Sequence, residues 1–533
     1  MSYLTYNGKF VQSNNKFVII GGSTPIFDLI LTFDNIGSAP VVTPSSVSQW
    51  NTWFDLPTQG TPFTSATVLG DVVTLSGGSN ITLKDYLFGD EEFAGPGLLS
   101  IVDTGCIINT GIGTFSDDNV GWGCYNLTTA VFPALTSIGF TAFLDAISLS
   151  SFTIPNGVSD IPYQAFSNTA LTTINIPASI TNIDGAAFDN CASLNAFNVS
   201  ISNNNYKDIS GVLYNKSQST IIRYPSAKAG LSYTIPTDVS IIKSRAFENS
   251  ALNSISMPNT ISLMEPNTFM QCTKLSSINL STSLTSLPAN AFNTCVSLGT
   301  ITIPSSITFI GSGAFAQTGL TNVTLPSSLT TLGSGAFQDS KLSSITLPNS
   351  LTYLAGFTFY GCTYLTDISL GNALTNINNW EFNQTGLTKI TIPDSVTSIG
   401  NGAFFQCPSL GTAIIGNGCA SIGDQAFRSC ALLTDVSLGN SVKTIGERAF
   451  FFTSITNVTI PASVTLIKDE AYASISPFPT LFNLYPLAAP SVNALNTFSS
   501  YAKPLHIKSS GTSGYNVSPW TNTAKFSSII QDL

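Results

Sequence analysis

Apolar residues recur at fixed distances before a repeated Ala-Phe pair, and polar residues fill most of the positions between them. Counted back from each phenylalanine, the apolar positions lie 17, 14, 12, 8 and 5 residues earlier. Before Phe404 they are Leu387, Ile390, Ile392, Val396 and Ile399. The first part of each unit alternates apolar and polar side chains and is rich in Ile, Val and Thr, which predicts a short strand. The strand often ends in proline, as at Pro393, because proline has no N–H for the ladder.

The repeated aromatic residue, here called the anchor, defines coils of nearly constant length. The anchors are Phe143, Phe166, Phe188, Phe247, Phe269, Phe292, Phe315, Phe337, Phe359, Phe382, Phe404, Phe427, Phe450 and Tyr472. Twelve of their thirteen spacings are 22 or 23 residues, and the interval from Phe188 to Phe247 is 59. A coil has 23 residues where Cys or Ala follows the anchor by three positions, and 22 where Thr or Ser does. One coil cannot bury its apolar side alone, so we predict stacked coils with the anchors forming a core ladder.

The segment Ile392-Pro-Asp-Ser-Val-Thr-Ser-Ile-Gly-Asn-Gly-Ala-Phe404-Phe-Gln-Cys-Pro-Ser-Leu410 resembles the BspA-type leucine-rich repeat, and the likeness extends over roughly residues 99–533. The resemblance implies a β-rich solenoid, a leucine-rich-repeat array of 22–23-residue coils with a parallel sheet. It also implies a role in adhesion or recognition. Residues 206–225 resemble the hairpin insertion of this family, which we expect to project from the stack. Leu505-His506-Ile507 and the residues after it resemble the family's closing unit.

The period divides the chain into four parts. We expect a small β-rich N-terminal attachment module over residues 1–98. Its first 20 residues are predicted to form a hairpin. An irregular capping coil follows over residues 99–127, anchored by Phe115. Repeats occupy residues 128–475, and a closing unit occupies residues 476–533. The opening Tyr3-Leu-Thr-Tyr-Asn-Gly-Lys-Phe-Val resembles the start of structural proteins from phages of Bacteroidetes-type hosts, and no secretory signal peptide is visible in it.

Composition narrows the chemistry further. Charged residues are only 9% of the 533 residues, and the net charge is −10, which argues against a nucleic-acid partner. No apolar run is long enough for membrane insertion. The single histidine, His506, sits in a strand-like segment and excludes most histidine-based metal and catalytic sites. We therefore expect no catalytic, cofactor-binding or metal-binding residues, no cofactor and no enzymatic activity.

Cysteines and acidic residues have structural explanations. Seven of the nine cysteines occupy core positions: Cys191, Cys272, Cys295, Cys362, Cys407, Cys419 and Cys430. Cys106 and Cys124 fall in the predicted capping coil and are either bridged or free. The acidic cluster Asp85, Asp90, Glu91 and Glu92 is a solvated loop or a calcium site, although it lacks regularly spaced ligands.

Side chains 13 and 15 positions before each anchor should point out of the stack, because strand side chains alternate. These positions form a hydroxyl-rich surface with few charges, here called the hydroxyl face. The residues of this face proposed to contact a ligand are Asn279, Thr302, Thr324, Thr346, Asp367, Ser369, Lys389 and Thr391. The alternative is that Ser and Thr are simply compatible with solvated strands.

Three functions are consistent with these patterns. The first is a non-enzymatic recognition or structural protein of a phage virion, tail or capsid-associated, joined to other virion proteins through residues 1–98 and binding a host-surface protein or glycan. The second is a cellular BspA-like adhesin at a microbial cell surface. The third is a polysaccharide-acting solenoid enzyme, which needs paired carboxylates. Asp367 and Asp435 lie three coils apart, roughly 14 Å at the usual strand spacing, too far for a glycosidase pair.

Overall fold

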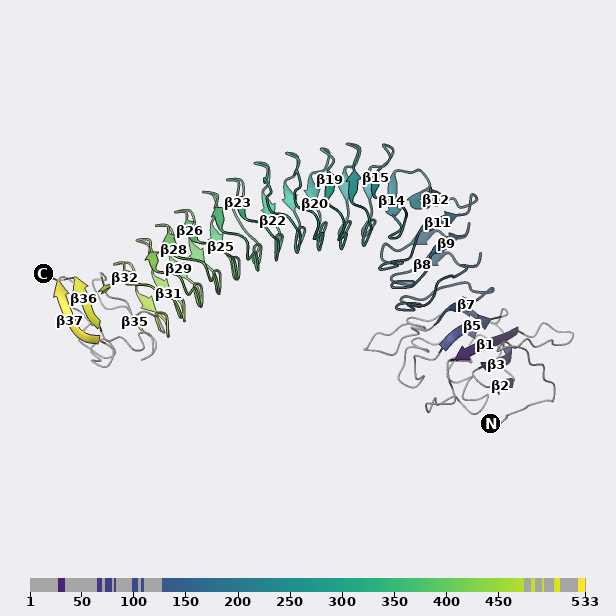
Figure 1. The fold of residues 1–533 in the computed structure, drawn as a ribbon, viewed down its shortest axis with the longest axis horizontal. Helices are drawn as coiled ribbons and strands as arrows, with labels where there is room; N and C mark the ends of the chain where they lie inside the picture. Colours follow the sequence, from purple (N-terminus) through teal and green to yellow (C-terminus); the bar gives the residue numbers. More distant parts are fainter. Residues whose placement is uncertain are drawn as a thin grey trace. The chain divides into compact units, whose positions relative to one another are not determined.

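The computed structural model describes residues 127–473 and, outside that range, the strands at 27–33, 65–69, 72–78, 81–82, 98–103, 107–109, 481–484, 491–492, 503–508 and 526–532. The first-20-residue hairpin, Phe115, Cys106, Cys124 and the acidic cluster at 85–92 lie outside the described residues. The chain forms two compact units (Figure 1). The first comprises residues 1–230 and 241–251, and the second comprises residues 231–240 and 252–533.

The N-terminal strands of the first unit join the sheet of its coils. These strands are β1 (Phe27–Phe33), β2 (Ser65–Leu69), β3 (Val72–Gly78) and β5 (Leu98–Asp103). Strand β1 pairs antiparallel with both β3 and β5, while β5 pairs in parallel with β7 (Thr129–Val131), the first strand of the repeat region. The sheet order β2-β3-β1-β5-β7 therefore carries one sheet across residue 98. A second, parallel pair joins β4 (Ile81–Thr82) to β6 (Ile107–Asn109).

The regular coils of the first unit form two parallel ladders. One contains β9 (Thr173–Ile176) and β11 (Ala196–Val199), and the other contains β8 (Asp160–Ile161) and β10 (Asn182–Ile183). Apolar side chains of β9 point inward and polar ones outward, as the alternation predicts.

The second unit repeats this arrangement, with all of its described strand pairs parallel (Figure 1). The strands that carry the hydroxyl face, and those that continue their ladder, are β15 (Ser232–Thr234), β17 (Ser254–Ser256), β19 (Ser277–Asn279), β23 (Ser344–Thr346), β24 (Asp367–Ser369), β26 (Lys389–Ile392), β28 (Thr412–Ile415), β30 (Asp435–Ser437), β32 (Asn457–Ile460), β34 (Leu481–Leu484), β36 (Lys503–Lys508) and β37 (Phe526–Asp532). The two-residue strands are β18 (Leu263–Met264), β20 (Ser286–Leu287), β21 (Phe309–Ile310), β22 (Thr331–Leu332), β25 (Asn376–Ile377), β27 (Ser398–Ile399), β29 (Ser421–Ile422), β31 (Thr444–Ile445), β33 (Leu466–Ile467) and β35 (Ser491–Val492). The predicted β-solenoid with parallel sheets is confirmed, and His506 lies on β36.

The anchor side chains are buried and stack ring on ring within each unit. In the second unit the stack runs from Phe269 to Tyr472, with centroid distances between 4.9 and 5.8 Å. The backbone follows the same register, since the N–H of Phe315 donates to the carbonyl of Ala336 in the next coil at 2.8 Å. Each anchor therefore fixes its neighbour through ring packing and a main-chain hydrogen bond.

The residue three positions after the anchor explains why two coil lengths fit one stack. In 22-residue coils a threonine hydroxyl donates to the carbonyl of its own anchor, as Thr318 does to Phe315 at 2.8 Å. In several 23-residue coils a cysteine thiol donates to the anchor carbonyl of the preceding coil, as Cys295 does to Phe269 at 3.1 Å. Both arrangements provide a side-chain donor to an anchor carbonyl. The seven core cysteines are buried, as predicted, and none of them forms a disulfide. Burial raises the pKa of the Cys362 thiol to about 12, which keeps this thiol protonated at neutral pH.

The long interval contains a hairpin, but the hairpin does not project from the stack as expected. Strands β12 (Tyr206–Ile209) and β13 (Val212–Asn215) pair antiparallel, and β13 then pairs antiparallel with β14 (Thr220–Arg223). The three residues from 212 to 214 are all buried. Strand β14 pairs in parallel with β16 (Ile241–Ile242), so the segment rejoins the ladder of the unit. The insertion is thus one enlarged coil whose buried side chains, among them Leu213 and Ile222, belong to the core of the preceding coils.

Candidate functional site

The hydroxyl face is exposed in the second unit. All eight of the residues predicted to form its ligand-contacting part are solvent-exposed. Neighbouring strands align them in rows, since Thr346 of β23 pairs with Ser369 of β24, and Thr391 of β26 pairs with Ile414 of β28. The face is therefore made of rows of polar side chains, and the 36%-exposed side chain of Ile414 interrupts one of them.

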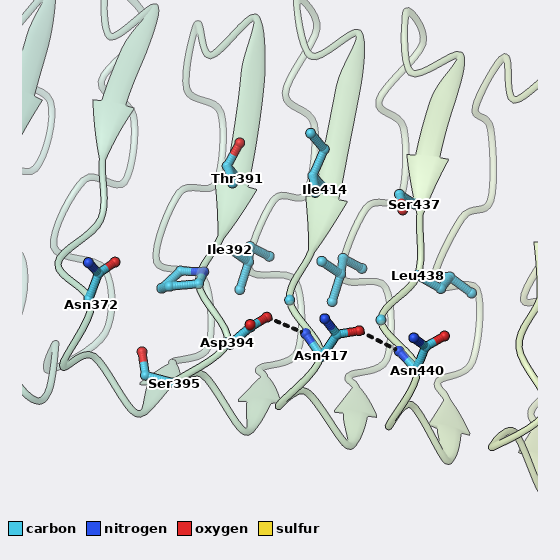
Figure 2. A pocket seen from close by; sticks show the side chains of 14 residues that line it. Asn372, Thr391, Ile392, Asp394, Ser395, Ile414, Asn417, Ser437, Leu438 and Asn440 are labelled. Carbon is cyan, nitrogen blue, oxygen red and sulfur yellow. Dashed lines mark hydrogen bonds between the residues drawn. The ribbon is translucent and has the colours of Figure 1, made fainter.

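A groove lies where three strands of this face end. It has a volume of about 670 Å³ and is formed by the last residues of β26, β28 and β30 and the turns after them (Figure 2). Ile392 and Ile415 are buried side chains of its lining, and Leu438 is half-buried. The row Thr391, Ile414 and Ser437 flanks the groove on one side. Of the eight predicted ligand-contacting residues, only Thr391 lines it.

A ladder of side-chain acceptors forms the opposite side of the groove. Asp394 Oδ1 accepts from the backbone N–H of Asn417 at 2.6 Å, and Asn417 Oδ1 accepts from the N–H of Asn440 at 3.2 Å (Figure 2). Each bond joins one coil to the next, so the turns are held rigidly. Because the Asn417 oxygen is engaged, its amide nitrogen remains as a donor toward a ligand.

Glycine at the eleventh position before the anchor makes the turns of the groove narrow. The coil anchored by Phe404 carries Pro393 at this position, whereas the following two coils carry Gly416 and Gly439. A Cβ atom on Gly439 would lie 2.1 Å from the carbonyl oxygen of Gly416, and one on Gly416 would lie 2.6 Å from the carbonyl carbon of Pro393. Only glycine allows this approach. The replacement of proline by glycine is the sequence signal that could have located the groove.

The face carries no cluster of charges suited to acid-base chemistry. Asp367 and Asp435 are both exposed and lie on β24 and β30, with β26 and β28 between them along the coils. Neither Asp367 nor Lys389 takes part in an ion pair among the described residues. The site can offer hydroxyl, amide and backbone groups beside apolar side chains, which suits a neutral polar ligand.

A cluster of two arginines and two carboxylates lies within the coils of the first unit. Arg223 Nη1 lies 2.9 Å from Asp189 Oδ1, and Arg245 Nη1 lies 2.9 Å from Asp189 Oδ2. Glu248 lies 3.0 Å from Arg245 and 3.6 Å from Arg223. Burial raises the pKa of Asp189, and the charge of Arg223 opposes that rise. The cluster ties the enlarged coil to the coils on either side, a structural role that sequence reasoning missed.

One carboxyl group is buried without a charged partner. Glu381 replaces the alanine that usually precedes the anchor, and its side chain is fully buried. Burial raises the pKa of Glu381 to about 7, although hydrogen bonding near Thr358 and Gly356 opposes this. Its position inside the stack separates it from the hydroxyl face.

Comparisons with known proteins cover most of the array. Residues 117–233, 228–342, 285–411 and 357–478 match the family described as BspA type leucine rich repeat region. No curated protein matches the sequence. No helix in the part of the chain that the structure describes is long and apolar enough to cross a membrane.

Two solved structures illustrate the similarity. A leucine-rich cell surface protein from Faecalibacterium prausnitzii is 31% identical, with a TM-score of 0.41, and the match covers 50% of this chain and 64% of that protein. A leucine-rich repeat protein from Bacteroides ovatus is 24% identical, with a TM-score of 0.40, and the match covers 61% of this chain and 98% of that protein. The family match carries the assignment, since it spans residues 117–478.

Proposed function

Because this chain belongs to the BspA-type leucine-rich repeat family, we propose that it is a non-enzymatic recognition protein of a bacterial cell surface. The hydroxyl face and the groove at its strand ends bind the ligand. The observation that carries this proposal is the exposed polar face, which ends in a rigid groove of about 670 Å³ lined by hydroxyl, amide and apolar groups. Pockets of this size with a few fixed polar groups are typical of small-ligand sites.

The ligand class follows from the charges. The groove contains one carboxylate, Asp394, and no basic residue. A neutral glycan, or an uncharged polar segment of a host protein, fits such a lining. Binding of this kind depends little on salt, since screening weakens interactions between charges.

The hypothesis that the protein acts at a cell surface is better supported than the hypothesis that it belongs to a virion. The virion reading depends on the opening residues alone, which lie outside the described range, and neither similar protein is named as a virion component. The cell surface is the location given for the Faecalibacterium prausnitzii protein.

The experiment that tests ligand binding uses a glycan array and intact host cells with the full chain. Substituting Thr391→Arg and Ser437→Arg together introduces bulk and charge at the groove and should abolish binding. Thr308→Arg, at an exposed position outside the hydroxyl face, is the matched control and should bind normally. Equal binding by the doubly substituted protein, or binding lost at 0.5 M salt, would contradict the proposal.

Attachment is proposed to use residues 1–98. Strands β1 and β3 of this part extend the sheet of the first unit, so the rest of the segment can contact a larger assembly without opening the coils. Cross-linking of the full chain on cells, followed by mass spectrometry, should give links to other surface components from Lys9, Lys16 or Lys84. Links confined to lysines of the array would reverse this assignment.

A further inference from the structure

A second surface of the array, at the turns around the anchors, carries aromatic side chains in adjacent coils. Its members stand two positions before, one after or two after an anchor, far from the strands of the hydroxyl face. We name it the corner strip: Phe357, Trp380, Phe405, Arg428, Phe451 and Phe452. Phe357 is 42% exposed and Phe452 is 56% exposed, and the other four are half-buried. Exposed aromatic residues of this density are unusual on a polar, low-charge surface.

Three of these aromatic residues adopt a backbone conformation that bulky side chains rarely take. Phe357, Trp380 and Phe452 have φ angles of 57°, 59° and 56°. The same turn positions have positive φ in other coils, where they carry residues from Gly335 and Asn290 to Gln425. The conformation is therefore a general feature of the turn, and what distinguishes these three coils is the aromatic side chain that the turn presents.

The structure also makes room for one of the rings. A Cβ atom on Gly402 would lie 2.6 Å from atoms of the Trp380 indole, so only glycine lets that ring lie against the next coil. Trp380 then packs edge-on against Phe405, with ring centroids 5.6 Å apart. The aromatic residues therefore form a packed and ordered surface across successive coils.

Arg428 occupies the middle of this surface and differs from the other arginines. The chain has four arginines, and Arg223, Arg245 and Arg448 each form ion pairs with carboxylates. Arg428 forms none within the described residues. Its guanidinium lies over the ring of Phe405 at 5.6 Å and over the ring of Phe451 at 5.4 Å. Nη1 donates to Gln425 Oε1 at 3.0 Å, and Nε has no hydrogen-bond partner.

We propose that the corner strip is a docking surface for a protein partner that presents a carboxylate between apolar side chains. The carboxylate pairs with Arg428, whose guanidinium is held in place by the two rings, and the apolar side chains cover Trp380 and Phe452. Arginine with aromatic neighbours is the composition typical of the energetic centre of protein interfaces. A stacked guanidinium recognises a carboxylate through directed hydrogen bonds.

An acidic oligosaccharide shares the charge but fits the geometry less well. Sugar rings bind to the open faces of aromatic rings, and Arg428 already lies over Phe405 and Phe451. The available surface around the guanidinium is therefore better matched to side chains of a peptide. The proposal is independent of the ligand of the hydroxyl face, because the two surfaces use different positions of the coil.

The test uses the full chain and two immobilised nonapeptide libraries. One library has Glu at its centre, flanked by Leu and Phe at varied positions, and the other is identical except for Gln at its centre. The wild-type protein should select Glu peptides over their Gln partners. Arg428→Gln should reduce binding of selected peptides at least tenfold, and Phe452→Ser should reduce it as well.

Two controls separate docking from folding. Lys341→Gln removes an exposed positive charge outside the corner strip, and it should leave peptide binding unchanged. Thermal melting of each variant confirms that the coils remain folded. The proposal is overturned if no Glu peptide is selected, if Gln peptides bind equally well, or if Lys341→Gln has the same effect as Arg428→Gln. Binding of oligogalacturonate alone, lost in Arg428→Gln, would assign the surface to acidic glycans instead.

Discussion

The ring of Tyr224 stacks on the ring of Phe247, with centroids 5.3 Å apart and an angle of 22° between the planes. Tyr224 precedes Phe247 by 23 residues, which is the regular spacing of the anchors. Its N–H donates to the carbonyl of Ala246 at 2.6 Å, the same bond that the other anchors make to the next coil. Tyr224 is therefore the anchor at the end of the enlarged coil, and the 59-residue interval divides into one coil of 36 residues and one regular coil of 23.

Substituting Tyr224→Ala should destabilise the first unit by about 3–5 kcal/mol, because it removes a fully buried aromatic ring and leaves a cavity. Denaturant unfolding followed by circular dichroism would measure the loss. Tyr364→Ala, at a 62%-exposed tyrosine, is the control and should change stability by less than about 0.5 kcal/mol. Equal effects of the two substitutions would remove Tyr224 from the core.

In the second unit, Phe337→Ala should also cost about 3–5 kcal/mol. Phe337 is fully buried and stacks on Phe315 and Phe359 at 5.4 and 5.8 Å. Phe309→Ala provides a matched control because that side chain is 41% exposed. Unchanged melting of the Phe337 variant would show that the ring ladder contributes little.

Glu381→Gln should stabilise the protein above neutral pH. The pKa of Glu381 is raised from 4.5 to about 7, so between these values the folded state binds a proton that the unfolded state has released. Stability from this group is therefore highest below pH 4.5 and falls as pH rises to about 7. The full difference is about 3 kcal/mol at 1.4 kcal/mol per pKa unit.

Melting temperatures of the wild type and the Gln variant, measured from pH 4 to pH 8, test this difference. The two curves should approach each other at pH 4 and separate at pH 8, with Gln the more stable. Asp367→Asn, at an exposed position, should produce no such divergence. Parallel curves for Glu381→Gln would mean that the carboxyl ionises as freely in the folded protein as in the unfolded chain.

Removing Arg223 should leave the buried carboxylates of Asp189 and Glu248 with too little positive charge beside them. Arg223→Met is expected to destabilise the first unit by about 3–5 kcal/mol, with a larger loss at high pH, where Asp189 is charged. Adding Asp189→Asn should restore part of the stability. Lys468→Met breaks a surface pair with Asp424 and should cost at most about 1 kcal/mol. A similar small loss for Arg223→Met would show that the buried cluster is not required for folding.

The period and the strand alternation were sufficient to predict the coils, the parallel sheets and the inward or outward direction of strand side chains. They depend on a repeated pattern of burial, which the sequence displays directly. Tyr224 was not predicted to be an anchor because its coil is lengthened by β12 and β13, and because Arg223 rather than alanine precedes it. An anchor in a coil of unusual length can be recognised only by counting back from the next one.

The candidate sites were harder to predict, because they depend on differences between coils. The groove arises where Gly416 and Gly439 replace a proline, and the corner strip arises where aromatic residues occupy turn positions filled by small or polar residues elsewhere. Neither change alters the apolar period. Pairing of Arg428 with two rings also requires the register of adjacent coils, which places positions 405, 428 and 451 side by side.

The two kinds of corner have a consequence for the history of the gene. Thr318 and Cys295 satisfy an anchor carbonyl from within the coil or from the coil after it, so coils of either length can be neighbours. Each coil also contacts chiefly the coils beside it. Unequal recombination between repeats would therefore add or remove whole coils and still yield a foldable chain. Array length can evolve by duplication and deletion, while single substitutions at exposed turns and strand ends diversify what each copy recognises.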